Sequence, residues 1–201
     1  MKITLGFDTK SIEKARKQIE SMIADLTSNR IITDLLNGCA DWFIAEANSN
    51  LARTDIGENV KLGIMESWIT QQIGNVITIT NTHEKAVYVE FGVGVKGEEN
   101  QHKNAKQAGY EYNVDSPAKD DNGTWHFYTN IENLDLPKSA LVDSSHIYKP
   151  ETRKDGSVYR QRVYVETRGT ESTMYAYNAL IDLKDIGIYE VWEQIKKKYW
   201  S

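Results

Sequence analysis

Residues 76–91 read VITITNTHEKAVYVEF, and this stretch decides the fold class. β-Branched residues fill positions 76–80, and apolar side chains alternate with other side chains over 86–91, as they do in strands. Residues 81–84, which lie between these runs, are polar, which is typical of a turn. We therefore predict a β-hairpin made of 76–80 and 86–91.

The chain before this hairpin has helical periodicity. Apolar residues recur every three or four positions over 11–26 and again over 32–51. This pattern predicts two helices, or one long helix bent at Asn29. A turn at 54–57 and a short helix at 61–68 are expected next, and the alternation at 3–7 predicts a short strand at the start.

The chain after the hairpin begins with a segment that has no apolar periodicity. Residues 92–109 start with glycines and continue with Lys, Glu, Asn and Gln. Segments of this length without periodicity are usually functional or disordered. We expect a long, exposed and mobile loop at about 92–109.

An aromatic, β-rich insertion is expected at about 110–168. The first strand is predicted at 110–114, and a second strand is predicted at 125–128, after a turn at 120–123. A third strand is predicted at 157–167, and residues 146–148 are its expected partner. Helical periodicity then returns over 174–199, on either side of Gly187. The whole chain, 1–201, is predicted to be a single α+β domain in which long N-terminal helices and a C-terminal helix pack on a mostly antiparallel sheet.

Charge and composition limit the classes of function. The chain has 201 residues, 26% of them charged, and a net charge of -5. An acidic balance argues against a protein that wraps nucleic acid, so we expect at most incidental DNA contact. The start lacks the apolar run of a signal peptide, and no stretch approaches the length of a membrane span. We expect a protein made in the cytoplasm, with no membrane contact.

The segment 92–97, GVGVKG, fits the dinucleotide fingerprint G-x-G-x-x-G. That mechanism needs a helix whose amide groups face the phosphates. Here Glu98 and Glu99 follow, without an apolar helical stripe, and their charge opposes phosphate. We interpret the glycines as a flexible hinge and expect no cofactor.

The other polar residues do not form a recognisable catalytic or metal motif. Cys39, the single cysteine, shares a stripe with apolar residues and is interpreted as a small buried hydrophobe. The histidines, at 83, 102, 126 and 146, lack metal-ligand spacing. Residues 196–198 are lysines at the end of a predicted helix, where they complement the helix dipole. We expect no catalytic residue and no metal.

Glu90 is the carboxylate that the sequence singles out. It lies between Val89 and Phe91, shortly before the glycines. Without a second carboxylate nearby in sequence, an acid–base role has little support. We expect a structural role, in which Glu90 accepts hydrogen bonds from backbone amides of the following turn or pairs with a Lys or Arg.

Three segments of the chain resemble a phage protein family. Residues 86–94, AVYVEFGVG, resemble a V-E-F-G-T-G signature of the head–tail joining and tail-completion proteins of long-tailed phages with lambda-like morphology. Residues 109–128 and 167–180 contain further segments in the order that this family uses. The chain departs from the family's pattern at Val93, which replaces Thr, at 173–174, where Pro-Phe is usual, and in the length of 130–167.

The resemblance implies a structural protein of the virion neck, made in the host cytoplasm from a phage or prophage gene, without an active site. Its implied partners are the connector or stopper ring and the tail terminator or tail tube proteins. It allows a ring oligomer in the virion and a monomer in the free protein. The loop is then the candidate docking segment, which becomes ordered on binding; its candidate residues are Gly92, Val93, Gly94, Lys96, Glu98, Glu99, His102 and Lys103.

Two other functions stay open. One is a different neck or tail component, such as a terminator or a stopper, which shares the size and α+β character. The other is a small cytoplasmic enzyme whose site is assembled from residues far apart in sequence.

Overall fold

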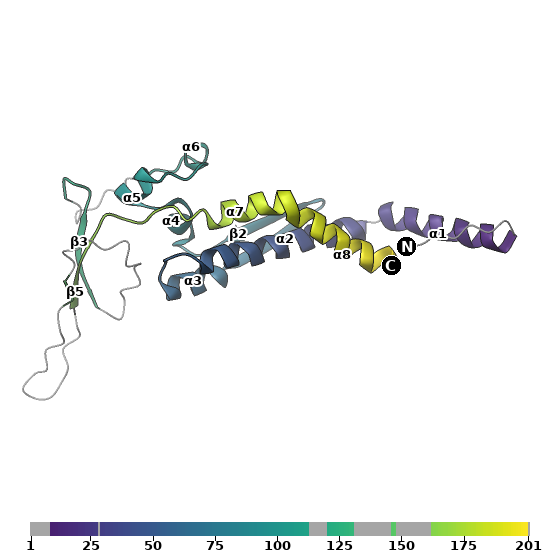
Figure 1. Cartoon of the computed structure of the whole chain (residues 1–201), viewed down its shortest axis with the longest axis horizontal. Coiled ribbons are helices and arrows are strands. Elements are labelled where there is room, and N and C mark those ends of the chain that lie inside the picture. Colours follow the sequence, from purple (N-terminus) through teal and green to yellow (C-terminus); the bar gives the residue numbers. More distant parts are fainter. Residues whose placement is uncertain (1–8, 28, 113–119, 131–145, 148–161, 201) are drawn as a thin grey trace, which may run out of the picture. The chain divides into compact units, whose positions relative to one another are not determined.

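The computed structural model describes residues 9–27, 29–112, 120–130, 146–147 and 162–200 (Figure 1). The fold is α+β, with two small antiparallel sheets among many helices. The chain divides into two compact units, which are described separately: one contains 1–46, 70–80 and 179–201, and the other 47–69 and 81–178. The predicted strand at 3–7 lies outside the described residues, as do 113–114, 148 and 157–161.

The helical prediction for the first quarter of the chain is confirmed. Helix α1 covers Thr9–Thr27 and helix α2 covers Asn29–Ala52. Two helices are thus described on either side of Ser28. The turn at 54–57 is present, and it is followed by α3, Glu58–Met65, which begins and ends about three residues earlier than predicted.

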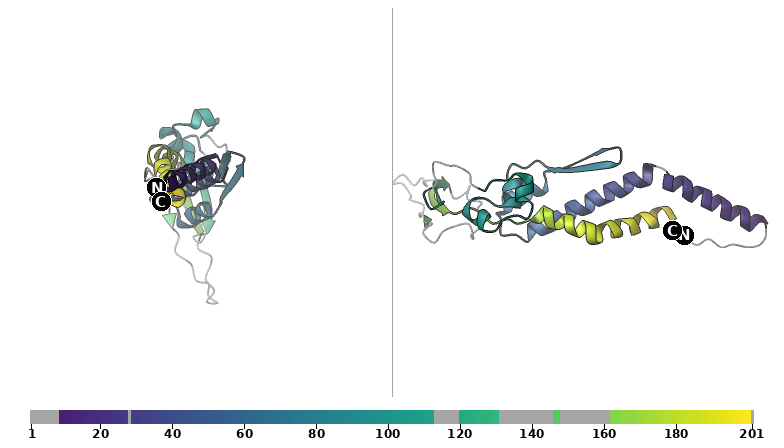
Figure 2. Two further views of the ribbon diagram at one scale, coloured as in Figure 1. Left: turned by 90° about the vertical axis from the view of Figure 1, so that its right-hand side faces the viewer. Right: turned by 90° about the horizontal axis from the view of Figure 1, so that it is seen from above.

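The first unit is held together by packing between α2 and the C-terminal helix, which lie side by side (Figures 1 and 2). The C-terminal helical run consists of α7 (Tyr175–Asp182), a π-helical turn η3 (Leu183–Gly187) and α8 (Ile188–Trp200). Ile31, Val191 and Ile195 are buried at the centre of this contact. Partly buried side chains surround them: Leu35, Cys39, Trp42, Trp192, Tyr199 and Trp200.

Two glycines let these helices approach closely. A Cβ on Gly38 would lie 2.6 Å from Cγ1 of Val191, and a Cβ on Gly187 would lie 2.8 Å from the ring of Trp42. The indole N–H of Trp42 also donates to Oε2 of Glu190 at 2.9 Å. The π-helical turn ends at Gly187, at the point of closest approach to Trp42.

The predicted hairpin is wrong in its second strand. The hairpin consists of β1 (Trp68–Ile73) and β2 (Val76–Asn81), and the right-hand view of Figure 2 shows it as a two-stranded ribbon. The run at 86–91 forms helix α4, Ala86–Phe91. Its buried residues, Ala86, Val89 and Glu90, follow the spacing of a helix face, so a six-residue apolar alternation did not distinguish the two structures.

The second unit contains the remaining short helices and the three-stranded sheet. Helices α5 (Gly94–Glu99) and α6 (Ala105–Ala108) occupy the segment predicted as an exposed loop. The sheet has the order β3-β5-β4, from β3 (Trp125–Asn130), β4 (His146–Ile147) and β5 (Arg162–Thr167). Both pairs are antiparallel, which confirms the predicted pairing of 146–148 with the strand that ends at Thr167. Tyr110–Tyr112, predicted as part of a strand, are not in one.

No helix in the described parts of the chain has the length and apolarity needed to cross a membrane.

The close contact between Gly38 and Val191 gives a testable prediction. We expect Gly38→Ala to lower the free energy of unfolding by about 1–2 kcal/mol because the new methyl group overpacks the interface. In a Val191→Ala background the same change should instead be neutral, or stabilising by up to about 1 kcal/mol, through helix propensity. Denaturant unfolding of the four proteins measures this coupling. An equal cost in both backgrounds would contradict the contact.

Asp34 gives a prediction about pH. Its carboxylate accepts hydrogen bonds from Nζ of Lys198 and, at 2.6 Å, from the hydroxyl of Tyr199. These bonds, that of Lys198 most of all, lower the pKa of Asp34 below its ordinary 3.8. Because the folded pKa is the lower one, the stabilisation is complete above pH 3.8 and is lost as the pH falls through the folded pKa.

We therefore expect Asp34→Asn to lower the free energy of unfolding by less than about 1 kcal/mol at pH 7, since the pair is partly exposed. The difference from the unsubstituted protein should shrink below pH 3.8. Urea unfolding at pH 7 and at successively lower pH measures it. Asp41→Asn, at an exposed position of the same helix, serves as the control; a difference that is independent of pH would rule out the ion pair.

Candidate functional site

The carboxylate of Glu90 is buried in the second unit. Glu90 is at the end of α4, and only 8% of its surface is exposed. Its Oε2 accepts the backbone N–H of Ala176 at 2.9 Å, and its Oε1 accepts the backbone N–H of Tyr177 at 2.9 Å. These amides belong to the first turn of α7, where N–H groups lack partners within the helix and negative charge is favoured.

The two helices are also joined by hydrogen bonds in the opposite direction, because the residues before α7 donate to the last carbonyl oxygens of α4. The hydroxyl of Ser172 donates to the backbone oxygen of Glu90 at 2.8 Å, and that of Thr173 donates to the oxygen of Val89 at 2.7 Å. The backbone N–H of Met174 also donates to the oxygen of Glu90. Met174 has φ +51°, the one positive φ of a non-glycine residue in the described chain. Strained backbone therefore occurs where the two helix ends are joined.

His102 is the third hydrogen-bond partner of the Glu90 carboxylate. Its Nε2 lies 3.0 Å from Oε1 of Glu90, while its Nδ1 accepts the backbone N–H of Asn104 at 3.0 Å. Because Nδ1 accepts a hydrogen bond, the ring proton is on Nε2, which donates to the carboxylate. We call this group the Glu90 cluster, consisting of Glu90, His102 and the aromatic rings packed around them: Phe91, Tyr110, Tyr112 and Tyr177.

The glycines of the 92–97 motif pack against the protein's own chain. A Cβ on Gly92, which has φ +78°, would lie 2.6 Å from the backbone nitrogen of Ser172. A Cβ on Gly94, which has φ +69°, would lie 2.3 Å from the ring of Trp125. A helix does begin at Gly94, contrary to the prediction, and Ser172 and Trp125 lie directly against the two glycines. The glycines thus serve close packing rather than a hinge.

Backbone hydrogen bonds fix the same segment on both sides. Val93 and Thr170 exchange two bonds at 2.9 and 3.0 Å as an antiparallel bridge, and the N–H of Gly94 donates to the oxygen of Tyr112 at 2.9 Å. The hydroxyl of Tyr110 donates to the oxygen of Gly92. Burial raises the pKa of that hydroxyl to about 12, so it remains a donor throughout the physiological range.

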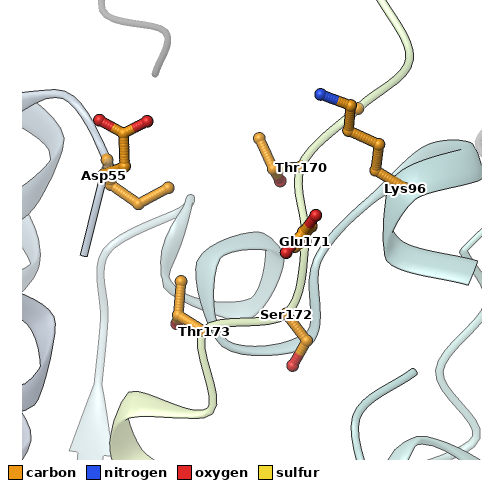
Figure 3. A pocket seen from close by; sticks show the side chains of 8 residues that line it. Asp55, Lys96, Thr170, Glu171, Ser172 and Thr173 are labelled. Atoms are coloured by element: carbon orange, nitrogen blue, oxygen red, sulfur yellow. The ribbon is translucent and has the colours of Figure 1, made fainter. Parts of the chain in front are cut away.

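A pocket of about 320 Å³ lies beside the Glu90 cluster (Figure 3). Segment 169–173 forms one wall, and Asp55, Ile56 and Lys96 complete the lining. Figure 3 shows Asp55 and Lys96 on opposite sides, with Glu171 between them. The hydroxyls of Ser172 and Thr173 are already used at the end of α4, so the charged groups left to face the pocket have mixed sign.

The structure separates the candidate docking residues into two groups. Gly92, Gly94 and His102 are buried, and Val93 and Lys96 are half-buried. The prediction of an exposed segment is therefore wrong for these residues, because short helices and the contacts with Thr170, Tyr110 and Tyr112 cover them. Glu98, Glu99 and Lys103 are exposed. Glu99 pairs with Arg168 at 3.2 Å, and Lys103 lies over the ring of Tyr177.

The other polar residues that the sequence singled out lie outside the Glu90 cluster. Cys39 is half-buried in the helical packing of the first unit, and burial raises the pKa of its thiol. Nδ1 of His83 accepts the N–H of Lys85, and His126 lies between Asp120 and Tyr164. His146 lies in β4. In the described residues, no group of three or more His, Cys, Asp or Glu side chains is arranged to hold a metal ion.

Sequence reasoning identified Glu90 correctly as an acceptor of backbone amides, but it placed those amides in the following turn. The donors come from α7, more than eighty residues later. The role of His102 was missed because its neighbours in sequence are polar, and nothing local indicates that it is buried.

No protein-family model matches the chain, and comparisons with curated proteins and with solved structures find no significant similarity.

The Glu90 cluster gives a prediction about stability. Glu90→Gln keeps the shape but replaces an acceptor oxygen by an NH₂ group that faces donors. We expect the free energy of unfolding to fall by about 1–3 kcal/mol, because a buried amide loses its acceptor. Hydrogen exchange at the amides of Ala176 and Tyr177 should speed up together with this loss. Glu171→Gln, at an exposed nearby position, is the matched control; equal effects of both substitutions would exclude the capping role.

Proposed function

We propose that this chain is a structural protein of the neck of a long-tailed phage, which joins the head to the tail or completes the tail. It acts by docking on ring-shaped partners, and it does so without making or breaking bonds. The observation that carries the proposal is that the three sequence segments resembling the neck family are in contact with one another around Glu90.

The contacts among these segments are specific. Residues of 86–94 supply Glu90 and the glycines, and the segment at 109–128 supplies Tyr110, Tyr112 and the ring of Trp125 over Gly94. The segment at 167–180 supplies the bridge through Thr170 and the amides at the start of α7. A shared set of motifs that forms one packed cluster supports a shared fold, because such residues depend on one another's shape.

The hydrogen bonds of Glu90 favour a structural role over acid–base chemistry. Both carboxylate oxygens accept bonds from α7 amides, and one also accepts His102. A general base needs a free oxygen that can reach a substrate proton. Here both oxygens are directed at the protein itself.

The cluster leaves a charged surface for docking. Glu98, Glu99 and Lys103 are exposed on a segment whose ends are fixed by Gly94, Tyr110 and Tyr112. A surface of this kind can add one modest contact per copy, and a closed ring repeats that contact many times. Partners at the neck would therefore be recognised by repeated charged contacts on a preformed support.

Deletion of the gene from the phage genome that encodes it tests the proposal. We expect electron microscopy of the lysate to show filled heads beside separate, finished tails. Supplying the unsubstituted gene in trans should restore complete virions. Intact infectious particles without the gene would overturn the proposal, and tails of irregular length would assign the protein to tail termination instead.

A complementation series then locates the docking surface. Charge reversal at Glu98 and Lys103 should leave the purified protein folded but should fail to restore virions, because both side chains are exposed. Charge reversal at Lys14, on the exposed part of α1, is the control and should complement normally. Complementation by protein with the reversed charges at Glu98 and Lys103, as well as by the control, would place docking elsewhere on the protein.

A further inference from the structure

The β1–β2 hairpin has a composition unlike the rest of the protein. Residues 67–82 contain no Asp, Glu, Lys, Arg or Pro, although charged residues make up 26% of the chain. The outward side chains are nevertheless exposed, with Ile69 at 55%, Ile73 at 72% and Val76 at 64%. Natural proteins usually protect an open strand edge with Lys, Pro or a bulge. This ribbon carries neither Lys nor Pro.

The hairpin register shows which backbone groups face outward. A two-residue turn at Gly74 and Asn75 makes Ile73 and Val76 the last hydrogen-bonded pair. The bond from the N–H of Thr82 to the oxygen of Ser67, at 2.9 Å, fits the same register at the other end. Pairs alternate along an antiparallel ladder, so the N–H and C=O groups of Ile77 and Ile79 point away from β1. In the described residues, this sheet has only two strands.

One face of the ribbon is half-buried and is hydrogen-bonded to α2 within the first unit, while the other face is exposed. Nε2 of Gln72 donates to Oγ1 of Thr33 on α2, and Ile77 and Ile79 are half-buried. Val76, Thr78 and Thr80 are exposed on the other face. The strand is therefore held in place with its edge available.

The sequence of β2 is nearly the same in both directions about Thr78. Reading outward from Thr78, isoleucine comes first on each side, at 77 and 79, and then a β-branched residue, Val76 or Thr80. An antiparallel copy centred on Thr78 would place Ile77 opposite Ile79 on the inner face and Val76 opposite Thr80 on the outer face. Such β-branched pairs are favourable across strands. The outward groups of Ile77 and Ile79 would then form the new hydrogen bonds.

We propose that β2 pairs edge to edge with β2 of a second copy of this chain, through a two-fold axis at Thr78, to form a four-stranded antiparallel sheet. The absence of charge from the ribbon lets two copies approach despite the net charge of -5 on each. A self-complementary edge closes a dimer and leaves no further β2 edge open. This proposal does not depend on the phage function.

Sedimentation velocity of the full chain tests the dimer. At about 1–100 µM the protein should sediment with twice its chain mass of 22.9 kDa. Thr78→Lys and Thr78→Glu each place like charges opposite one another and should weaken the dimer about tenfold or more. Mixing the two variants in equal amounts should restore dimers. Val87→Lys, at a valine that is 51% exposed on α4, adds the same charge and should leave the dimer unchanged.

Covalent trapping tests the register. In a Cys39→Ser background, Thr78→Cys should form a disulfide between two copies, because paired Cβ atoms at a non-hydrogen-bonded position lie close together. Ile73→Cys, which is farther from the axis, should not. Circular dichroism verifies that each variant is folded. A monomer at every concentration, unchanged association of both charged variants, or no recovery on mixing would overturn the proposal.

Discussion

The carboxylate of Glu90 is the one interaction on which the second unit depends. It takes up amides at the start of α7 that would otherwise be unsatisfied, and it holds His102 in the tautomer that Asn104 also requires. A buried carboxylate is costly to desolvate, and several charge-assisted hydrogen bonds are needed to offset that cost. Removing any one partner leaves the others imperfectly paired. The cluster therefore behaves as a unit, and the chain segments that meet there are fixed relative to one another.

This constraint explains the glycines next to Glu90. With α4 and α7 joined end to end, the chain leaving α4 has to pass directly beside Thr170 and Ser172, where a side chain on Gly92 would meet backbone atoms. Gly94, where α5 begins, then lies against the ring of Trp125. The V-E-F-G-x-G pattern can thus be explained as one carboxylate and two close approaches. A nucleotide-binding loop uses similar glycines to make room for a phosphate, whereas here they make room for the protein's own backbone at Gly92 and for the ring of Trp125 at Gly94.

The sequence predicted the long helices, and those strands of the insertion that the structure describes, because their periodicity is local. Apolar residues recur at helical spacing along α1, α2 and α8, and the residues of β2 and β3 have strong β propensity. Helix α4 was predicted as a strand because six residues, AVYVEF, satisfy both periods, and what decides between them is burial of Glu90 by α7. The hairpin partner was assigned wrongly although the Gly74-Asn75 pair, a strong two-residue turn signal, precedes β2.

The candidate site shows even more clearly that local sequence does not reveal contacts between distant segments of the chain. Glu90 was recognisable because a lone acidic residue in an apolar run must find donors, but its donors come from a segment far along the chain. His102 has no such signal, because its burial is produced by Tyr112 and Phe91 after folding. The edge of β2 is the opposite case, since its charge-free, β-branched sequence is visible in the chain alone. Its significance follows only from the structure, which fixes the inner face through Gln72 and leaves the outward groups of Ile77 and Ile79 at an open edge. Polar groups that satisfy one another hold the second unit together, whereas in the described residues the outward donors and acceptors of β2 remain available to another strand.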